Sequence, residues 1–226
     1  MRGVFVTGTD TGVGKTVVAA AVCAALRARG ERVAAWKPVV TGVEEAERPG
    51  WPPDHELLAL AAGGEPAAVA PLTFGPAVSP HLAAELDGSE IEPPDLVASA
   101  RAAGVGAEIL VIEGVGGLLV PLTLGFLVRD LARELALPLV VAARPGLGTI
   151  NHTLLTVEAA RAVGLTVVGV VLTPWPEAPS VVERSNRDTI ERLAGVEVAT
   201  LPWLPRADPE LLAGAGAGLP LAAWVD

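Results

Sequence analysis

The chain has 226 residues and a formal net charge of −10, and we expect residues 1–226 to form one large domain with a substantial core. No run approaches the ~18 apolar residues of a membrane span, and the lack of a lysine- or arginine-rich cluster argues against nucleic acid as the main partner. A single cysteine, Cys23, forms no disulfide and suits the reducing cytoplasm, where we expect the protein to act.

The predicted elements mostly alternate between strand and helix. In chain order the sequence predicts a strand at 4–6, a helix at 17–26, a strand at 32–36, a loop at 44–53, a helix at 55–62, an irregular segment at 63–92 with a short helix from 79 to 84, a helix at 93–103, a strand at 108–113, a helix at 126–136, a strand at 139–143, a helix at 151–163, a strand at 166–172, a helix at 180–193, a strand at 196–201 and a Gly/Ala-rich tail. Most of these strands are continuous apolar runs, as expected for strands buried on both faces. The pattern favours an α/β fold of three layers, α/β/α, with a mostly parallel central sheet.

The segment Gly8-Thr-Asp-Thr-Gly-Val-Gly-Lys-Thr16 joins the first predicted strand to the first predicted helix. A strand, a glycine-rich loop, Gly-Lys-Thr and a helix are typical of a phosphate-binding loop, where backbone N–H groups and the helix N-terminus surround an anion. The match is a variant, because five residues rather than four separate Gly8 from Gly14. The alternative is a glycine-rich turn with a solvated lysine. The residues expected to contact a nucleotide are Gly12, Val13, Gly14, Lys15, Thr16 and Val17.

Charged or glycine-rich segments follow the other predicted strands as well. In open parallel sheets, ligands bind beyond the carboxyl ends of the strands. Lys37 follows the second strand and, with Lys15, is one of only two lysines in the chain, so we expect it to contact phosphate or substrate. Glu113 ends the central strand, where a carboxylate can hold magnesium or merely cap a glycine turn. Asp54 is either a metal ligand or the N-cap of the helix at 55–62.

Several segments together resemble the dethiobiotin synthetase family. They are GTDTGVGKT, KPVVTG, SPHLAA, EGVGG, LGTINH and LPWLP, in this order over residues 3 to about 205. The resemblance implies a P-loop NTPase-like fold and a homodimeric ligase of biotin synthesis. Its substrates would be ATP, carbon dioxide and 7,8-diaminononanoate, whose two amines are closed into the ureido ring of dethiobiotin with magnesium as the cofactor.

The resemblance also implies roles for single residues. Lys15 matches the lysine that stays in contact with the γ-phosphate during its transfer. Lys37 matches the lysine near the carbamate and the transferring phosphate. Both are the expected catalytic residues. The positions that match magnesium ligands are Thr16, Asp54 and Glu113. The positions that match substrate contacts are Thr11, Thr41 and Asn151, the last holding the substrate carboxylate across the subunit interface. Residues on the nucleotide side, beyond the phosphate loop, are Thr173 and Pro202.

Two departures from the family pattern concern charge and base recognition. Some members carry a lysine where this chain has Gly146, so any charge supplied there is missing. An asparagine that reads the nucleotide base is replaced by Thr173. A hydroxyl discriminates less than an amide, which offers both a donor and an acceptor. We therefore predict a relaxed base preference.

Other classes of phosphate-loop protein remain as alternatives. A nucleotide switch of the partition or cell-division ATPase type would carry a signature lysine early in the loop, where this chain has Asp10. A sibling ligase that amidates a cofactor precursor would need an amidotransferase domain, for which no room remains. A kinase acting on a small metabolite is not excluded by the phosphate loop alone.

Overall fold

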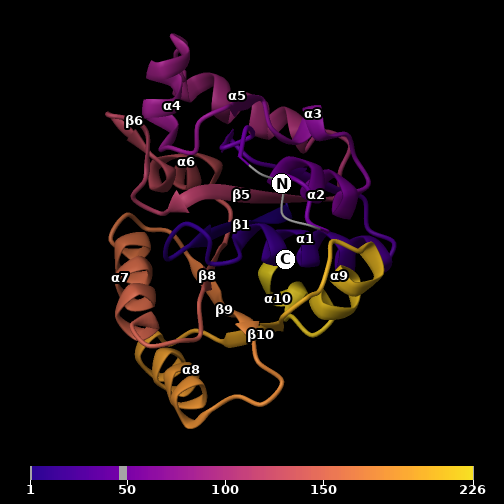
Figure 1. The fold of residues 1–226 in the computed structure, drawn as a ribbon, viewed down its shortest axis with the longest axis vertical. Coiled ribbons are helices and arrows are strands. Elements are labelled where there is room, and N and C mark those ends of the chain that lie inside the picture. The colour runs from indigo at the N-terminus through magenta and orange to yellow at the C-terminus, as the bar shows by residue number, and fades with distance from the viewer. Residues whose placement is uncertain (1, 46–49, 226) are drawn as a thin grey trace.

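The computed structural model describes residues 2–45 and 50–225, so residues 46–49 of the predicted loop at 44–53 lie outside the described residues. Within these ranges the main sheet has six strands in the order β10-β9-β8-β1-β5-β2, and every neighbouring pair is parallel (Figure 1). The strands are β1 (Arg2–Gly8), β2 (Val33–Trp36), β5 (Ile109–Gly117), β8 (Leu139–Ala143), β9 (Val167–Trp175) and β10 (Val198–Pro202). The parallel sheet predicted from the continuous apolar runs is confirmed.

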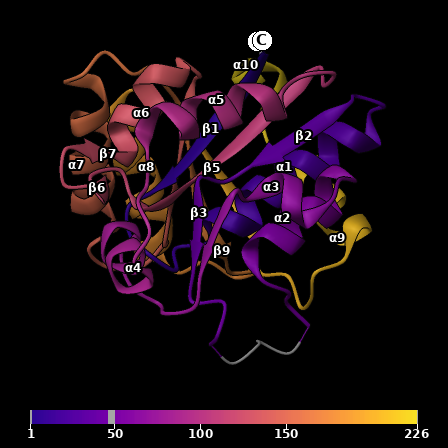
Figure 2. The ribbon, with the colours of Figure 1, turned by 90° about the horizontal axis from the view of Figure 1, so that it is seen from above.

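Helices cover both faces of this sheet, so the predicted three-layer arrangement is also confirmed (Figures 1 and 2). One face packs against α1 (Lys15–Ala28), α2 (Asp54–Ala62), α3 (Pro66–Val69), α9 (Pro209–Gly216) and α10 (Leu221–Val225). The other packs against α4 (Pro80–Asp87), α5 (Pro93–Ala103), α6 (Val128–Leu135), α7 (Thr149–Arg161) and α8 (Val181–Ala194). No helix within residues 2–45 and 50–225 is both long and apolar enough to cross a membrane.

The core is divided by the alternation of side chains along each strand. In β5, Ile109 and Val111 point into the layer that holds α1, whereas Leu110 and Ile112 point into the layer that holds α6. Successive strand residues face opposite sides of a sheet, so a strand covered on both faces must be apolar throughout. Glu113, the next residue of β5, is therefore a carboxylate placed where the layer structure favours an apolar side chain.

Several short elements were not predicted. The segment at 63–92 contains α3 and the strand β4 (Leu72–Phe74), which pairs in parallel with β3 (Val39–Thr41), besides α4, which matches the short helix predicted at 79–84. The helix predicted from residue 126 begins at Val128, because β7 (Phe126–Leu127) pairs with β6 (Pro121–Thr123). The predicted tail forms α9 and α10 instead.

Close approach of two helices explains why the Gly/Ala-rich tail is ordered. A Cβ atom added to Gly216 of α9 would lie 2.1 Å from the backbone oxygen of Ala21 in α1. Only a glycine allows α9 to lie this close to α1. Trp224 of α10 is buried at 1% exposure and lies against Gly169 of β9, which anchors the end of the described chain to the sheet.

We predict that Gly216→Ala lowers the free energy of unfolding by about 1–3 kcal/mol, because the new methyl group overlaps the α1 backbone. Gly214→Ala is the matched control, since it lies in the same helix with nothing within 4 Å of the added Cβ. That change should be neutral or stabilise by up to about 1 kcal/mol. Urea denaturation of the two variants checks this, and equal effects would contradict the packing argument.

Candidate active site

The phosphate loop connects β1 to α1 at the carboxyl edge of the sheet. Gly14 is the N-cap of α1 with φ 95°, a left-handed conformation that favours glycine. A Cβ at this position would also lie 2.7 Å from Cγ2 of Thr173, at the end of β9. The α1 N-terminus therefore opens directly onto the loop, as expected for an anion-binding helix N-terminus.

A buried lysine lies between two carboxylates beside this loop. Nζ of Lys37 donates to Oδ2 of Asp54 at 2.6 Å and to Oε1 of Glu113 at 2.7 Å. The side chains of Lys37 and Glu113 are 5% and 0% exposed, whereas that of Asp54 is 44% exposed. The cluster is thus closed at the sheet and open on the side of Asp54.

The register of the sheet brings the lysine and the glutamate together. Trp36 of β2 pairs with Ile112 of β5, so Lys37 and Glu113 are the next residues on neighbouring strands. Asp54 reaches them from the first residue of α2. The prediction that Asp54 is the N-cap is wrong, because Pro53 holds that position and the Asp54 carboxylate bonds to side chains of other elements.

Burial and the close charges act in opposite directions on this cluster. Burial disfavours the ammonium form of Lys37, but the Glu113 and Asp54 carboxylates outweigh this and raise the pKa of Lys37 above its ordinary value. Burial raises the pKa of Glu113, with Lys37 opposing the shift. For Asp54, burial is outweighed by the Lys37 ammonium, which lowers the pKa of this carboxyl. Lys37 is therefore a charged group at neutral pH rather than a proton acceptor.

The oxygen atoms around Thr16 fit a magnesium site. Oγ1 of Thr16 lies 2.9 Å from Oδ1 of Asp54 and 3.0 Å from Oε1 of Glu113. A hydroxyl has one proton and can donate to only one of these oxygens at a time. Adjacent ligands of an octahedral magnesium ion, at bond lengths of about 2.0–2.1 Å, are themselves about 2.9 Å apart. Oε2 of Glu113 is buried without a hydrogen-bond partner, which is a further oxygen suited to a hard cation.

Within the described part of the chain, no group of three or more His, Cys, Asp or Glu side chains is placed to hold a metal ion. The oxygen set at Thr16 has only two carboxylates. A magnesium ion that takes few protein ligands keeps its remaining positions for phosphate oxygens and water. The donor set therefore matches a nucleotide-bound ion better than a structural one.

Two cationic side chains donate to backbone carbonyls of the phosphate loop. Nζ of Lys15 donates to the backbone oxygen of Asp10 at 2.9 Å, and Nη2 of Arg144 donates to the backbone oxygen of Gly12 at 3.2 Å. Burial lowers the pKa of Lys15, although the nearby Glu113 carboxylate opposes this shift. Lys15 is 6% exposed, so its charge acts in a partly desolvated place.

The remaining predicted residues lie around this centre at different distances. Thr11 lies beside Gly116 of β5, where an added Cβ would lie 3.4 Å from the Oγ1 of Thr11. Thr41 ends β3 and is half-buried, and Thr173 is buried against Gly14. Four of the predicted residues are exposed: Thr11 and Gly12 in the phosphate loop, Asn151 on α7 and Pro202 at the end of β10.

Two residues at this edge had no predicted role. Arg144 follows β8 at the carboxyl edge of the sheet, and nothing in the sequence indicated that it reaches the phosphate loop. Asn186 lies inside α8, and its Nδ2 donates to the backbone oxygens of Pro145 and Gly146 at 3.0 and 3.2 Å. A single asparagine within a predicted helix carries no signal for such a contact.

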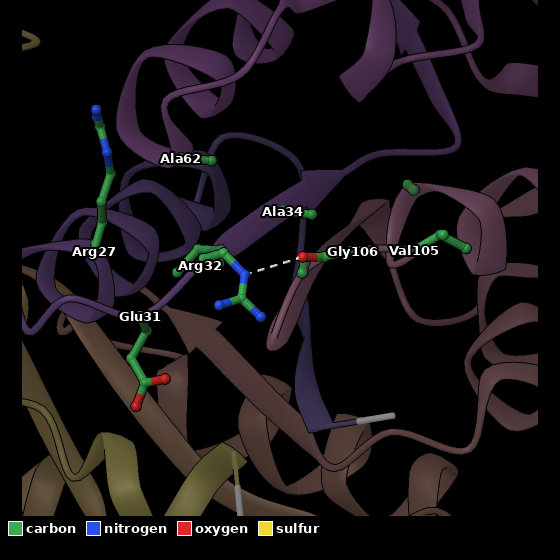
Figure 3. Close-up of a pocket in the computed structure, with 10 residues that line it drawn as sticks. Arg27, Glu31, Arg32, Ala34, Ala62, Val105 and Gly106 are labelled. Carbon is green, nitrogen blue, oxygen red and sulfur yellow. Dashed lines mark hydrogen bonds between the residues drawn. The ribbon is translucent and has the colours of Figure 1, made fainter.

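The structure also contains a cavity of about 380 Å³ away from this site (Figure 3). It lies at the amino end of β2 and β5, the opposite edge of the sheet, and Arg27, Arg32 and Val105 are among its lining residues. Arg32 is held there by Gly106 and Glu108. Because ligands of parallel sheets bind at the carboxyl edge, the charged cluster is the stronger candidate for the active site.

Comparisons with known proteins agree with the geometry. A family model described as an AAA domain matches residues 2–210. The chain is 48% identical over 210 residues to an ATP-dependent dethiobiotin synthetase BioD of Anaeromyxobacter dehalogenans (strain 2CP-1), covering 91% of this chain and 92% of the relative. Proteins of the same name from Rhodococcus jostii (strain RHA1) and Bacillus subtilis (strain 168) are 42% and 34% identical, covering 98% and 88% of this chain and 93% and 85% of each relative.

We predict that Lys37→Met lowers the free energy of unfolding by about 3–5 kcal/mol, because it leaves the buried Glu113 carboxylate without its counter-charge. The double variant Lys37→Met/Glu113→Gln should recover part of that loss, since only the half-exposed Asp54 then stays unpaired. Denaturant titrations without magnesium measure both values. A double variant no more stable than Lys37→Met would show that the charge pair does not govern the loss.

Proposed function

The chain belongs to the dethiobiotin synthetase family, and we propose on that basis that it is an ATP-dependent ligase that makes dethiobiotin. The substrates are 7,8-diaminononanoate, carbon dioxide and ATP, and the products are dethiobiotin, ADP and phosphate. The observation that carries the assignment to this site is the Lys37 ammonium beside the phosphate loop, held by Asp54 and Glu113.

The reaction proceeds through three steps in one site: carbamate formation, phosphoryl transfer and ring closure. One amine of the diamine adds to carbon dioxide and loses a proton, which gives a carbamate. A carbamate oxygen attacks the γ-phosphorus of ATP, and the bond to the ADP oxygen breaks, which gives a carbamic-phosphoric anhydride. The second amine then attacks the carbamoyl carbon, the phosphate leaves, and loss of a proton completes the ureido ring.

Each intermediate is anionic, so fixed positive charge and positioning supply the catalysis. Lys37 remains protonated because its two carboxylate neighbours raise its pKa, and its ammonium stabilises the carbamate and the transferring phosphoryl group. Lys15, at the end of the phosphate loop, stays in contact with the γ-phosphate during its transfer. The carboxylates also fix the position of the Lys37 ammonium, so little reorganisation is needed during the reaction.

The residues that would hold magnesium are Thr16, Asp54 and Glu113; Oδ1 of Asp54 and Oε1 of Glu113 lie 2.9 and 3.0 Å from Oγ1 of Thr16. When bound there, magnesium would supply positive charge that offsets the charge of the phosphates. Thr11 and Thr41 flank the diamine side, where their hydroxyl groups orient the amine or carbamate.

We propose further that the active unit is a homodimer in the cytoplasm. Asn151 and Leu155 are four residues apart on α7 and therefore share one helix face. Leu155 is 57% exposed and the preceding Leu147 is 97% exposed. A second subunit on this face would cover the two leucines and allow Asn151 to bind the substrate carboxylate at the interface.

We predict that phosphate release from ATP, magnesium and bicarbonate depends on added diamine, because the carbamate is the phosphoryl acceptor. Lys37→Gln should lower kcat by about 10²-fold or more, as expected when one charged stabilising donor is lost. Arg192→Gln is the control, since it removes the same charge from an exposed position on α8. Diamine-independent hydrolysis would instead indicate a nucleotide switch.

We predict from Thr173 that ATP is preferred over CTP and GTP by less than about tenfold in kcat/KM, about 1.4 kcal/mol of discrimination. Thr173→Asn should raise the preference for ATP, because an amide both donates to and accepts from the base. Initial rates with the three nucleotides at saturating diamine give the ratios. A wild-type preference for ATP above about a hundredfold would contradict this account.

A further inference from the structure

Arg144 and Lys15 lie on the same part of the phosphate loop. The carbonyl that accepts from Arg144 belongs to Gly12, and the one that accepts from Lys15 belongs to Asp10. Residues two positions apart are separated by at most about 7 Å between Cα atoms. The lysine of such a loop reaches the outer phosphates, and the guanidinium of Arg144 contacts the loop only two residues from the carbonyl that this lysine contacts.

The guanidinium of Arg144 has more N–H donors than its bond to Gly12 uses. Arginine has five N–H donors in a planar fork, and the bond to Gly12 uses only one of them. Arg144 is exposed, so its other donors are accessible from solvent. Arginine is also the side chain best suited to bidentate contact with a phosphate.

A buried side chain of α8 holds the loop that carries Arg144. Asn186 of α8 is 6% exposed, and its amide donates to the carbonyls of the two residues that follow Arg144. Asn186 thereby fixes the backbone of Pro145 and Gly146 against α8. This contact limits where the arginine side chain can reach, and it directs that side chain towards Gly12.

The charged side chains of the site do not by themselves offset the negative charge of the bound reactants. Lys15 and Lys37 carry two positive charges, and Asp54 and Glu113 carry two negative charges, so their formal sum is zero. Lys37 is bonded to both carboxylates. ATP and a carbamate bring several negative charges, which magnesium offsets only in part. Arg144 is the cationic side chain that contacts the loop from outside this neutral cluster.

We propose that Arg144 is a further residue of the ATP site, whose guanidinium binds an oxygen of the γ-phosphate, and that Asn186 is its positioning residue. This inference rests on the proposed function, because it assigns the γ-phosphate of ATP as the ligand. The arginine stabilises the negative charge that develops as the phosphoryl group is transferred.

Calorimetric titration with Mg²⁺ and either the β,γ-imido analogue of ATP or ADP tests the proposal without turnover. Arg144→Ala should weaken binding of the triphosphate analogue about tenfold, one lost charge-assisted contact, and binding of ADP by less than about threefold. Arg144→Lys should lie between wild type and Arg144→Ala, because it keeps the charge and loses the fork. The matched control is Arg101→Ala, which removes another exposed guanidinium that donates to a carbonyl, that of Glu134, at 3.2 Å.

Equal losses for the two nucleotides would overturn the proposal, because they would show that Arg144 only supports the loop. The proposal would also be overturned if Arg144→Ala bound the triphosphate analogue as tightly as Arg101→Ala does. The kinetic readout is the ATP KM and kcat in diamine-dependent phosphate release. Wild-type enzyme without such release would refute the proposed function but leave the calorimetric comparison intact, so the two failures are distinguishable.

The positioning role of Asn186 has its own readout. Asn186→Ala should weaken binding of the triphosphate analogue in the wild-type background, with ADP affected less. In the Arg144→Ala background it should add little to that loss, because the group it positions is gone. Additive losses in the double variant would show that Asn186 does not act through Arg144.

Discussion

A buried ammonium group held by two carboxylates is the constraint on which the rest of the site depends. Lys37 and Glu113 are almost fully removed from solvent, and each would be costly to bury alone. Together with Asp54 and the Thr16 hydroxyl they form a compact charged cluster at the start of α1. This arrangement fixes a positive charge, a set of oxygen atoms and the N-terminus of α1 in one place.

The topology of the sheet makes this arrangement possible. β5 lies between β1 and β2, so its carboxyl end lies beside both the phosphate loop and Lys37. Because all three strands are parallel, their carboxyl ends meet at the same edge. The apolar side chains of the two covered faces stabilise the strands, and the polar groups can then be confined to their ends. α9 and α10 complete the layer behind α1 through close contacts at Gly216 and Trp224.

The features that sequence alone predicted are those with a local pattern. The phosphate loop, the parallel sheet and the placement of Lys37 and Glu113 follow from continuous apolar runs and from what stands after each one. Asp54 was ambiguous because a helix start and a ligand edge both favour aspartate; in the structure Pro53 is the N-cap, and the Asp54 carboxylate contacts Lys37 and Thr16. The short elements at 63–92 and the last helices depend on tertiary packing. Asn186 acts on a loop 40 residues away, which no local pattern encodes.

We propose that the Lys37 ammonium stabilises the reacting carbamate and phosphoryl group. A crystal structure with the β,γ-imido analogue of ATP, magnesium and the carbamate of the diamine tests it most directly. The account predicts Nζ of Lys37 within hydrogen-bond distance of both a carbamate oxygen and a γ-phosphate oxygen. A structure in which Nζ still contacts only Asp54 and Glu113, with both reactants bound beyond its reach, would contradict it.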